Sequence, residues 1–152
     1  MKANELMIGD WVGIEYYATG VAIDGNIKAE KKLMQCKVFR IEEHIVTLGR
    51  PDGMIQDCLV SDLIPIPLTS DILLQNGFEF EQGALEGVYV FEDEDINTRI
   101  VVHPKETNYT KGDYTYIHVD HGCVSVEELP IMNVHELQNS LRSFYIEKEI
   151  EL

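Results

Sequence analysis

Apolar and polar residues alternate with a period of two in much of the first 68 residues. In residues 11–17, Val12, Ile14 and Tyr16 alternate with Gly13 and Glu15. This alternation is typical of a β-strand with one buried face. We expect further strands in four segments of this part of the chain, at residues 20–24, 33–43, 44–49 and 55–68.

Turn-forming residues separate these segments at residues 24–26, 48–50 and 51–53, where Gly accepts a positive φ and Pro fixes φ. Five strands in about 60 residues predict a small closed β-barrel, because closure removes unpaired sheet edges. Pro65 and Pro67 cannot donate ladder hydrogen bonds, so the barrel should end with them. We therefore place a domain boundary near Leu68, between a barrel at 1–68 and an α+β half at 69–152.

The second half is predicted to begin with a short helix at residues 70–76. Thr69 or Ser70 can cap its first turn, and Gly77 can end it in the left-handed conformation, with Phe78 folding back on Leu73. Period-two alternation then returns, which predicts antiparallel strands within residues 78–129. The predicted fold class is mainly β within α+β.

A second helix is predicted at residues 133–144. Asn133 with Glu136 forms an Asn variant of the capping box. An apolar stripe faces the core at i, i+3, i+7 and i+10, and it consists of Val134, Leu137, Leu141 and Phe144. The opposite face should be solvated, and its hydrogen-bonding side chains also make it a candidate interaction surface: His135, Gln138, Asn139 and Arg142.

A second candidate interaction surface lies on the predicted strand at residues 114–119. Tyr114, Tyr116 and His118 share one face, and the aliphatic residues share the other. If the aliphatic face is buried, the tyrosines remain near the surface, where aromatic side chains with hydroxyl groups favour protein contacts. The alternative is that both faces are covered.

Several metal-ligating side chains occur close together in residues 116–124, where His118, Asp120, His121 and Cys123 lie within six positions. With His103 they define the alternative hypothesis of a metal-dependent or hydrolytic enzyme. However, positions 118 and 120 share a strand face that 121 does not, and Asp120-His121-Gly122 is typical of a tight turn. Neither CxxC nor HExxH spacing is present, and no nucleophile or phosphate-binding motif occurs. We predict no enzyme activity, no metal and no cofactor.

The charge restricts the classes of partner. The chain has 27 Asp and Glu against 12 Lys and Arg, a formal net charge of −15. Nucleic acid binding depends on cations that neutralise phosphates, so we expect no nucleic acid partner. A basic protein partner fits this charge better, and an acidic inhibitor that mimics DNA is a further alternative.

Cysteine usage and hydropathy indicate the compartment. Cys36, Cys58 and Cys123 are odd in number and widely spaced, as expected of reduced thiols in a cytoplasm. No apolar run follows the early Lys2, so we expect no secretory signal. No stretch approaches the roughly 18 apolar residues of a membrane span, so we predict a cytoplasmic protein without membrane contact.

Three blocks of the sequence, "KANELMIGDWV", "LIPIPLTSDILLQNGF" and "NVHELQNSLRSF", match a known family plan in order and spacing. With them the chain resembles a family of small uncharacterised proteins of gut Bacteroidetes and of their prophages and other mobile elements. The resemblance implies a bacterial cytoplasmic setting and a mobile-element origin, and it assigns no activity. The "GDWV" segment also looks like the first strand of an SH3-like barrel. Our leading hypothesis is a non-enzymatic interaction or accessory protein that binds another protein.

Overall fold

The computed structural model describes residues 2–21, 27–82, 87–94, 97–103, 115–121 and 124–152. For 4, 19–21, 27–28, 115–119, 121 and 124–130 it describes the backbone alone. Contacts divide the chain into a compact unit of Met1–Ile66 and a second of Pro67–Glu151. The sequence placed the boundary near Leu68.

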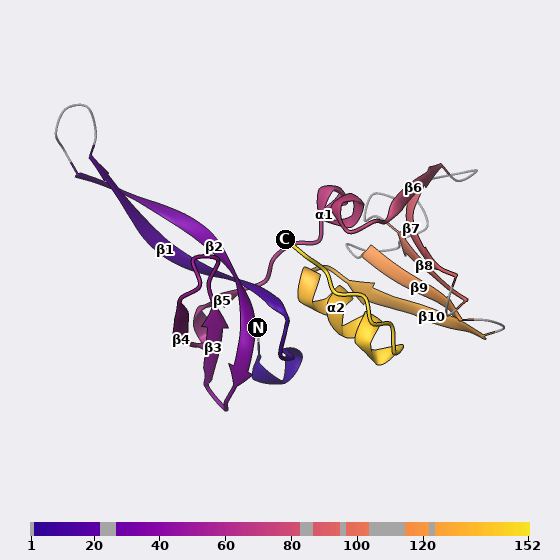
Figure 1. The fold of residues 1–152 in the computed structure, drawn as a ribbon, viewed down its shortest axis with the longest axis horizontal. Helices are drawn as coiled ribbons and strands as arrows, with labels where there is room; N and C mark the ends of the chain where they lie inside the picture. The colour runs from indigo at the N-terminus through magenta and orange to yellow at the C-terminus, as the bar shows by residue number, and fades with distance from the viewer. Residues whose placement is uncertain (1, 22–26, 83–86, 95–96, 104–114, 122–123) are drawn as a thin grey trace. The chain divides into compact units, whose positions relative to one another are not determined.

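The first unit is an antiparallel sheet of five strands in the order β4-β3-β2-β1-β5 (Figure 1). Two one-turn 3₁₀ helices accompany the sheet, at Ala3–Glu5 (η1) and Val60–Asp62 (η2). The second of them connects β4 to β5 and so joins the two ends of the strand order. The strands are β1 (Trp11–Val21), β2 (Ile27–Ile41), β3 (Ile45–Gly49), β4 (Ile55–Leu59) and β5 (Leu63–Ile64).

Strands β1 and β2 are longer than the sequence pattern predicted. They pair from Trp11↔Lys37 to Val21↔Ile27, so the predicted segments 11–17 and 20–24 belong in part to one strand. Cross-strand contacts continue the pairing where the alternation fades, including an ion pair between Glu15 and Lys31 at 2.5 Å. Figure 1 shows this hairpin extending past the other strands of its sheet. The predicted turn at residues 24–26 lies outside the described residues.

One face of the first sheet forms a hydrophobic core. Strand alternation turns Val12 and Ile14 inward on β1, and the inward positions of β2 and β3 meet them. An extra residue in β2, Phe39, interrupts the β2–β3 register and leaves its ring on the outer face above Gly49. The buried cluster comprises Leu6, Val12, Ile14, Cys36, Val38, Val46, Leu48, Val60 and Leu63.

The second unit is an antiparallel meander in the order β10-β9-β8-β7-β6, with a helix at each end of its sequence. Its sheet contributes buried side chains such as Tyr89, Ile100 and Val102. The elements are α1 (Ser70–Gln75), β6 (Glu79–Gln82), β7 (Gly87–Asp93), β8 (Thr98–His103), β9 (Thr115–His121), β10 (Val124–Ile131) and α2 (Val134–Ser143).

Both helices have the caps that the sequence predicts. The Thr69 hydroxyl accepts a hydrogen bond from the Ile72 N–H at 3.3 Å. Gly77 has φ of 76°, and the Phe78 N–H donates to the Leu73 carbonyl at 3.1 Å, which closes α1 in a Schellman motif. At the start of α2, the Glu136 carboxylate accepts from the Asn133 N–H at 3.0 Å.

The predicted mainly β, α+β character with antiparallel sheets and a C-terminal helix is confirmed. The first sheet is open, since no strand in the described part of the chain pairs β4 with β5. Closure into an SH3-like barrel therefore stays a prediction. In the described part of the chain, neither α1 nor α2 is long or apolar enough to cross a membrane.

Candidate functional site

The polar row of α2 is not the solvated face that the sequence predicted. His135 and Gln138 are 3% and 1% exposed, so they cannot form an open contact surface in this fold. Asn139 and Arg142 are half-buried, and the Arg142 guanidinium donates to the Asn139 side-chain oxygen at 3.4 Å. Those two residues remain candidates for an interaction surface.

The burial of Gln138 results from the C-terminal segment, which packs against α2. The Gln138 amide donates from Nε2 to the Lys148 carbonyl at 3.2 Å and accepts at Oε1 from the Ile150 N–H at 2.8 Å. Ile146 and Ile150 are buried beside it, at 2% and 1% exposed. The side chain thus binds a backbone segment of its own chain in the way that a neighbouring strand would.

A second amide side chain holds the same segment. Asn76, at the end of α1, donates from Nδ2 to the Glu151 carbonyl at 2.9 Å and accepts from the Glu151 N–H at 2.8 Å. It also donates to the Ile72 carbonyl at 2.8 Å. The segment from Ile146 to Glu151 is therefore fixed by Asn76 and Gln138.

Most residues of the predicted tyrosine surface and metal cluster fall where side chains are not described. Tyr114 and Cys123 lie outside the described residues, and Tyr116, His118 and His121 are described by backbone alone. His103 is half-buried on β8 and pairs in register with Tyr116. Among the described side chains, no three His, Cys, Asp or Glu residues converge as a metal site.

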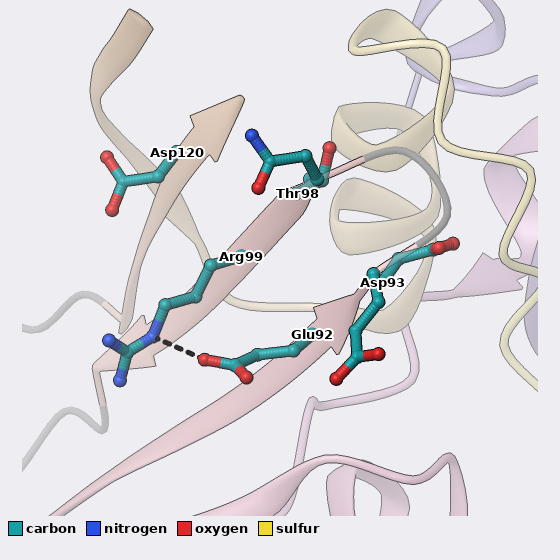
Figure 2. A pocket seen from close by; sticks show the side chains of 7 residues that line it. Glu92, Asp93, Thr98, Arg99 and Asp120 are labelled. Atoms are coloured by element: carbon teal, nitrogen blue, oxygen red, sulfur yellow. Dashed lines mark ion pairs between the residues drawn. The ribbon is translucent and has the colours of Figure 1, made fainter. Parts of the chain in front are cut away.

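A hollow of about 260 Å³ lies where β7 and β8 approach their connection (Figure 2). Figure 2 shows Arg99 paired with Glu92, at 3.3 Å, and Asp120 on the adjacent strand. Arg99 also pairs with Glu81 at 2.8 Å. Since two carboxylates already neutralise this guanidinium, the hollow offers little attraction for an anion. Its chemistry is that of an acidic surface.

The acidic residues are concentrated in the second unit. Residues 67–151 contain 17 Asp and Glu against 5 Lys and Arg, whereas residues 1–66 contain 10 against 7. The second unit therefore carries a formal charge of −12 and the first unit −3. This asymmetry means that the two units present different surfaces to a charged partner.

Strand β4 forms one edge of the first sheet and has an unusual distribution of side chains. Its largest apolar residues point to the outer face, where Ile55 is 66% and Leu59 51% exposed. The smaller or polar Gln56 and Cys58 take the half-buried inner positions. Exposed apolar neighbours on this side of the sheet include Phe39, whose ring lies over Gly49, and Ile45, which pairs with Leu59.

A larger hollow, of about 470 Å³, lies beside the inner face of β4. Its β4 residues are Gln56 and Cys58, and η2 adds Ser61 and Asp62. The hairpin of β1 and β2 closes another side and contributes the Glu15–Lys31 ion pair and Tyr17. Apolar, hydroxyl, carboxylate and ammonium groups therefore meet in one recess next to an edge strand.

Comparison with known proteins adds no assignment. No family model, curated protein or solved structure matches the chain.

The two described cysteines are poor candidates for nucleophiles. Burial raises the pKa of the Cys36 thiol. Burial also raises the pKa of the Cys58 thiol, and the nearby Asp62 carboxylate raises it further. A raised thiol pKa lowers the fraction of thiolate, which is the reactive form.

Sequence reasoning missed the β4 edge and the recess beside it. Their residues come from β1, β2, β4 and η2, and they meet through strand pairing between distant parts of the chain. The order Ile55, Gln56, Asp57, Cys58, Leu59 does contain one local indication. Ile55, Asp57 and Leu59 are two positions apart, so on a strand they point to the same face. The sequence therefore predicts one face of this strand that carries both apolar and charged side chains.

Proposed function

We propose that the chain is a non-enzymatic interaction protein that binds another protein through the β4 edge of its first unit. The observation that carries the proposal is the exposure of Ile55 and Leu59 on an edge strand. Proteins usually protect such edges with charges, prolines or covering elements, because an apolar edge is a template for pairing with another chain. On β4, Asp57 is the one charged side chain on the exposed face, and the two large apolar side chains on either side of it form the docking element.

The proposal includes an SH3-like barrel for the first unit, one that stays open between β4 and β5 so that the β4 edge is left for a partner. The strand order β4-β3-β2-β1-β5 and the 3₁₀ turn η2 between β4 and β5 support it. We also place the protein in the bacterial cytoplasm, in the mobile-element family that its three sequence blocks resemble. An accessory protein without an active site acts by binding other molecules, which agrees with the surface identified on β4.

The proposal can be tested by capture from a bacterial lysate with three forms of the tagged chain. These are the native protein, an edge variant with Ile55→Ser and Leu59→Ser, and a control variant with Leu74→Ser and Met132→Ser. The control side chains are 49% and 48% exposed, so both variants remove exposed apolar surface. Circular dichroism would verify that each variant is folded.

We expect the native and control proteins to retain the same partner and the edge variant to lose it by about tenfold, as for a central apolar contact. Mass spectrometry with intensity quantification provides the measurement. If the edge variant captured the same proteins in the same amounts, β4 would not be the docking element and the proposal would fail.

A second candidate function, an acidic inhibitor that mimics DNA, is favoured by the charge of −12 on the second unit. Exposed carboxylates on its sheet include Glu79, Glu81 and Glu92. We would measure whether the chain displaces a fluorescent duplex of about 20 base pairs from a basic DNA-binding protein. Displacement that is lost in Glu79→Lys/Glu92→Lys and kept in the edge variant would support this second function.

A further inference from the structure

We infer that the β4 edge takes up an extended segment of its partner in which apolar residues alternate with Lys or Arg. The segment adds a sixth strand to the first sheet. Its apolar side chains lie on the outer face with Ile55 and Leu59, and its cationic side chains enter the recess lined by Gln56 and Asp62. This inference rests on the proposed function and specifies the chemistry of the partner.

The backbone of β4 has the pairing geometry for an added strand. The Val60 N–H donates to the His44 carbonyl at 3.0 Å, and the Arg50 N–H donates to the Met54 carbonyl at 2.9 Å. In an antiparallel ladder every second residue of a strand bonds to the same neighbouring strand. Because Met54 and Val60 bond to residues flanking the two ends of β3, Gln56 and Cys58 are the residues of β4 that bond to β3.

The peptide groups of the alternate residues, Ile55, Asp57 and Leu59, consequently point away from β3. No described strand pairs with that edge. An extended segment can therefore form main-chain hydrogen bonds along β4, which is the way that β-augmentation provides affinity.

The two faces of β4 determine which side chains such a segment should carry. Successive residues of a strand point to opposite faces, so every second side chain of the added segment lies on the outer face. There it meets Ile55 and Leu59, which favour an apolar residue. Asp57 lies between them on the same face and already accepts a hydrogen bond from the Thr47 hydroxyl at 2.6 Å. The remaining side chains point to the inner face, toward the recess of about 470 Å³.

The charge of the recess and its surroundings favours a cation at those remaining positions. From Glu42 to Asp62 the chain has five carboxylates and one basic side chain, Arg50. The Arg50 guanidinium is already paired with Asp52 at 2.8 Å. In the recess itself, Lys31 is paired with Glu15, so the two charges offset each other and Asp62 contributes one further carboxylate. Tyr17 and Ser61 contribute hydroxyl groups that can hydrogen-bond a guanidinium or ammonium group.

A second copy of this chain fits the edge less well than a basic segment. Two copies would bring together chains of formal charge −15, and each β4 would place its own Asp57 and Asp62 near those of the other. Like charges that face each other across an interface oppose association. A basic partner gains from the same charges.

The test uses fluorescein-labelled peptides of about eight residues, a common strand length, and the complete chain. The first peptide alternates valine with arginine, and the second alternates valine with glutamate. The third type has the sequence of the first with N-methyl groups on alternate amides, and it is made in two phases, one methylated at the valines and one at the arginines. Fluorescence anisotropy measures affinity. Hydrogen exchange measures protection of the Ile55, Asp57 and Leu59 amides.

We expect the valine–arginine peptide to bind at least about tenfold more tightly than the valine–glutamate peptide, as complementary charge predicts. One phase of N-methylation should abolish binding, because it removes the donors that face β4. Asp62→Lys should weaken the binding of the basic peptide several-fold, whereas the control Glu147→Lys, which makes the same charge change at an exposed site of the second unit, should have little effect.

Three results with the peptides would overturn the inference. The peptides could bind equally regardless of charge, N-methylation in both phases could leave affinity unchanged, or the β4 amides could remain unprotected in the bound state. A dimer in light scattering that Leu59→Ser dissolves would also overturn it, in favour of a second copy. If lysate capture depends on Ile55 and Leu59 while the basic peptide shows no preference, the proposed function stands and the partner chemistry is wrong.

Discussion

Replacement of Gln138 by Ala should destabilise the protein and release its C-terminal segment. The side chain is 1% exposed and makes two hydrogen bonds to backbone, to the Lys148 carbonyl and from the Ile150 N–H. Each buried backbone group left without a partner costs about 1–3 kcal/mol. We therefore expect the free energy of unfolding to fall by about 2–5 kcal/mol, with some recovery if water enters the site.

Replacement of Gln138 by Glu separates the two hydrogen bonds. The carboxylate can still accept from the Ile150 N–H, but it places an oxygen against the Lys148 carbonyl, where the amide had donated. The protonated acid can donate there, so the folded state should raise the pKa of the introduced carboxyl group above the ordinary Glu value of about 4.3. Stability of this variant is then greatest below the unfolded pKa and is lost as the pH rises through the raised folded pKa.

Urea unfolding and hydrogen exchange test both variants. The unfolding transitions give the change in stability, and the exchange rate of the Ile150 amide reports on the segment itself. Glu147→Ala, an exposed change on the same segment, should shift stability by less than about 0.5 kcal/mol and serves as the control. Gln138→Ala with the stability and Ile150 protection of this control would refute the role of the amide. So would a Gln138→Glu variant whose deficit does not change with pH.

Three further predictions concern other parts of the chain. Asn76→Ala should expose the Glu151 amide to exchange and lower the free energy of unfolding by about 2–4 kcal/mol, because two side-chain bonds to the Glu151 backbone are lost; unchanged Glu151 protection would contradict this. Cys36 and Cys58 should react with iodoacetamide at pH 7 much more slowly in the native than in the urea-unfolded chain, since burial raises both thiol pKa values; equal rates by mass spectrometry would refute the assignment. Tyr145 has φ of 60° and is 92% exposed, so Tyr145→Gly should stabilise the fold by about 1 kcal/mol in urea unfolding, and a loss of stability would contradict the strain argument.

The C-terminal helix was predictable because its determinants are local. The apolar stripe of Val134, Leu137 and Leu141 is fully buried, and Glu136 caps the first turn as the spacing requires. The burial of its polar residues could not be predicted from the helix alone. Gln138 is buried by residues that follow it by 10 and 12 positions, and no periodic pattern in the helix contains that information.

The two long strands show a similar limit. The sequence around residues 18–20, Ala-Thr-Gly, breaks the apolar alternation, so two separate strands were predicted at 11–17 and 20–24. In the structure these residues continue β1, because β2 runs beside them and pairs in register with them from Lys28 to Glu30. Pairing with another strand can thus override a weak local preference.

At the β4 edge, the structure departs from the sequence pattern in a way that indicates a function. A strand that only had to support the fold would turn Ile55 and Leu59 inward and leave Gln56 outside, since one residue of register shift exchanges the two faces. The observed register does the opposite, and the fold tolerates two large apolar side chains in water at the edge of its sheet. Large apolar side chains that stay exposed without stabilising the fold are expected at a functional surface. An alternative register that buried Ile55 and Leu59 and exposed Cys58 would remove this reasoning, and the alkylation rate of Cys58 distinguishes the two registers directly.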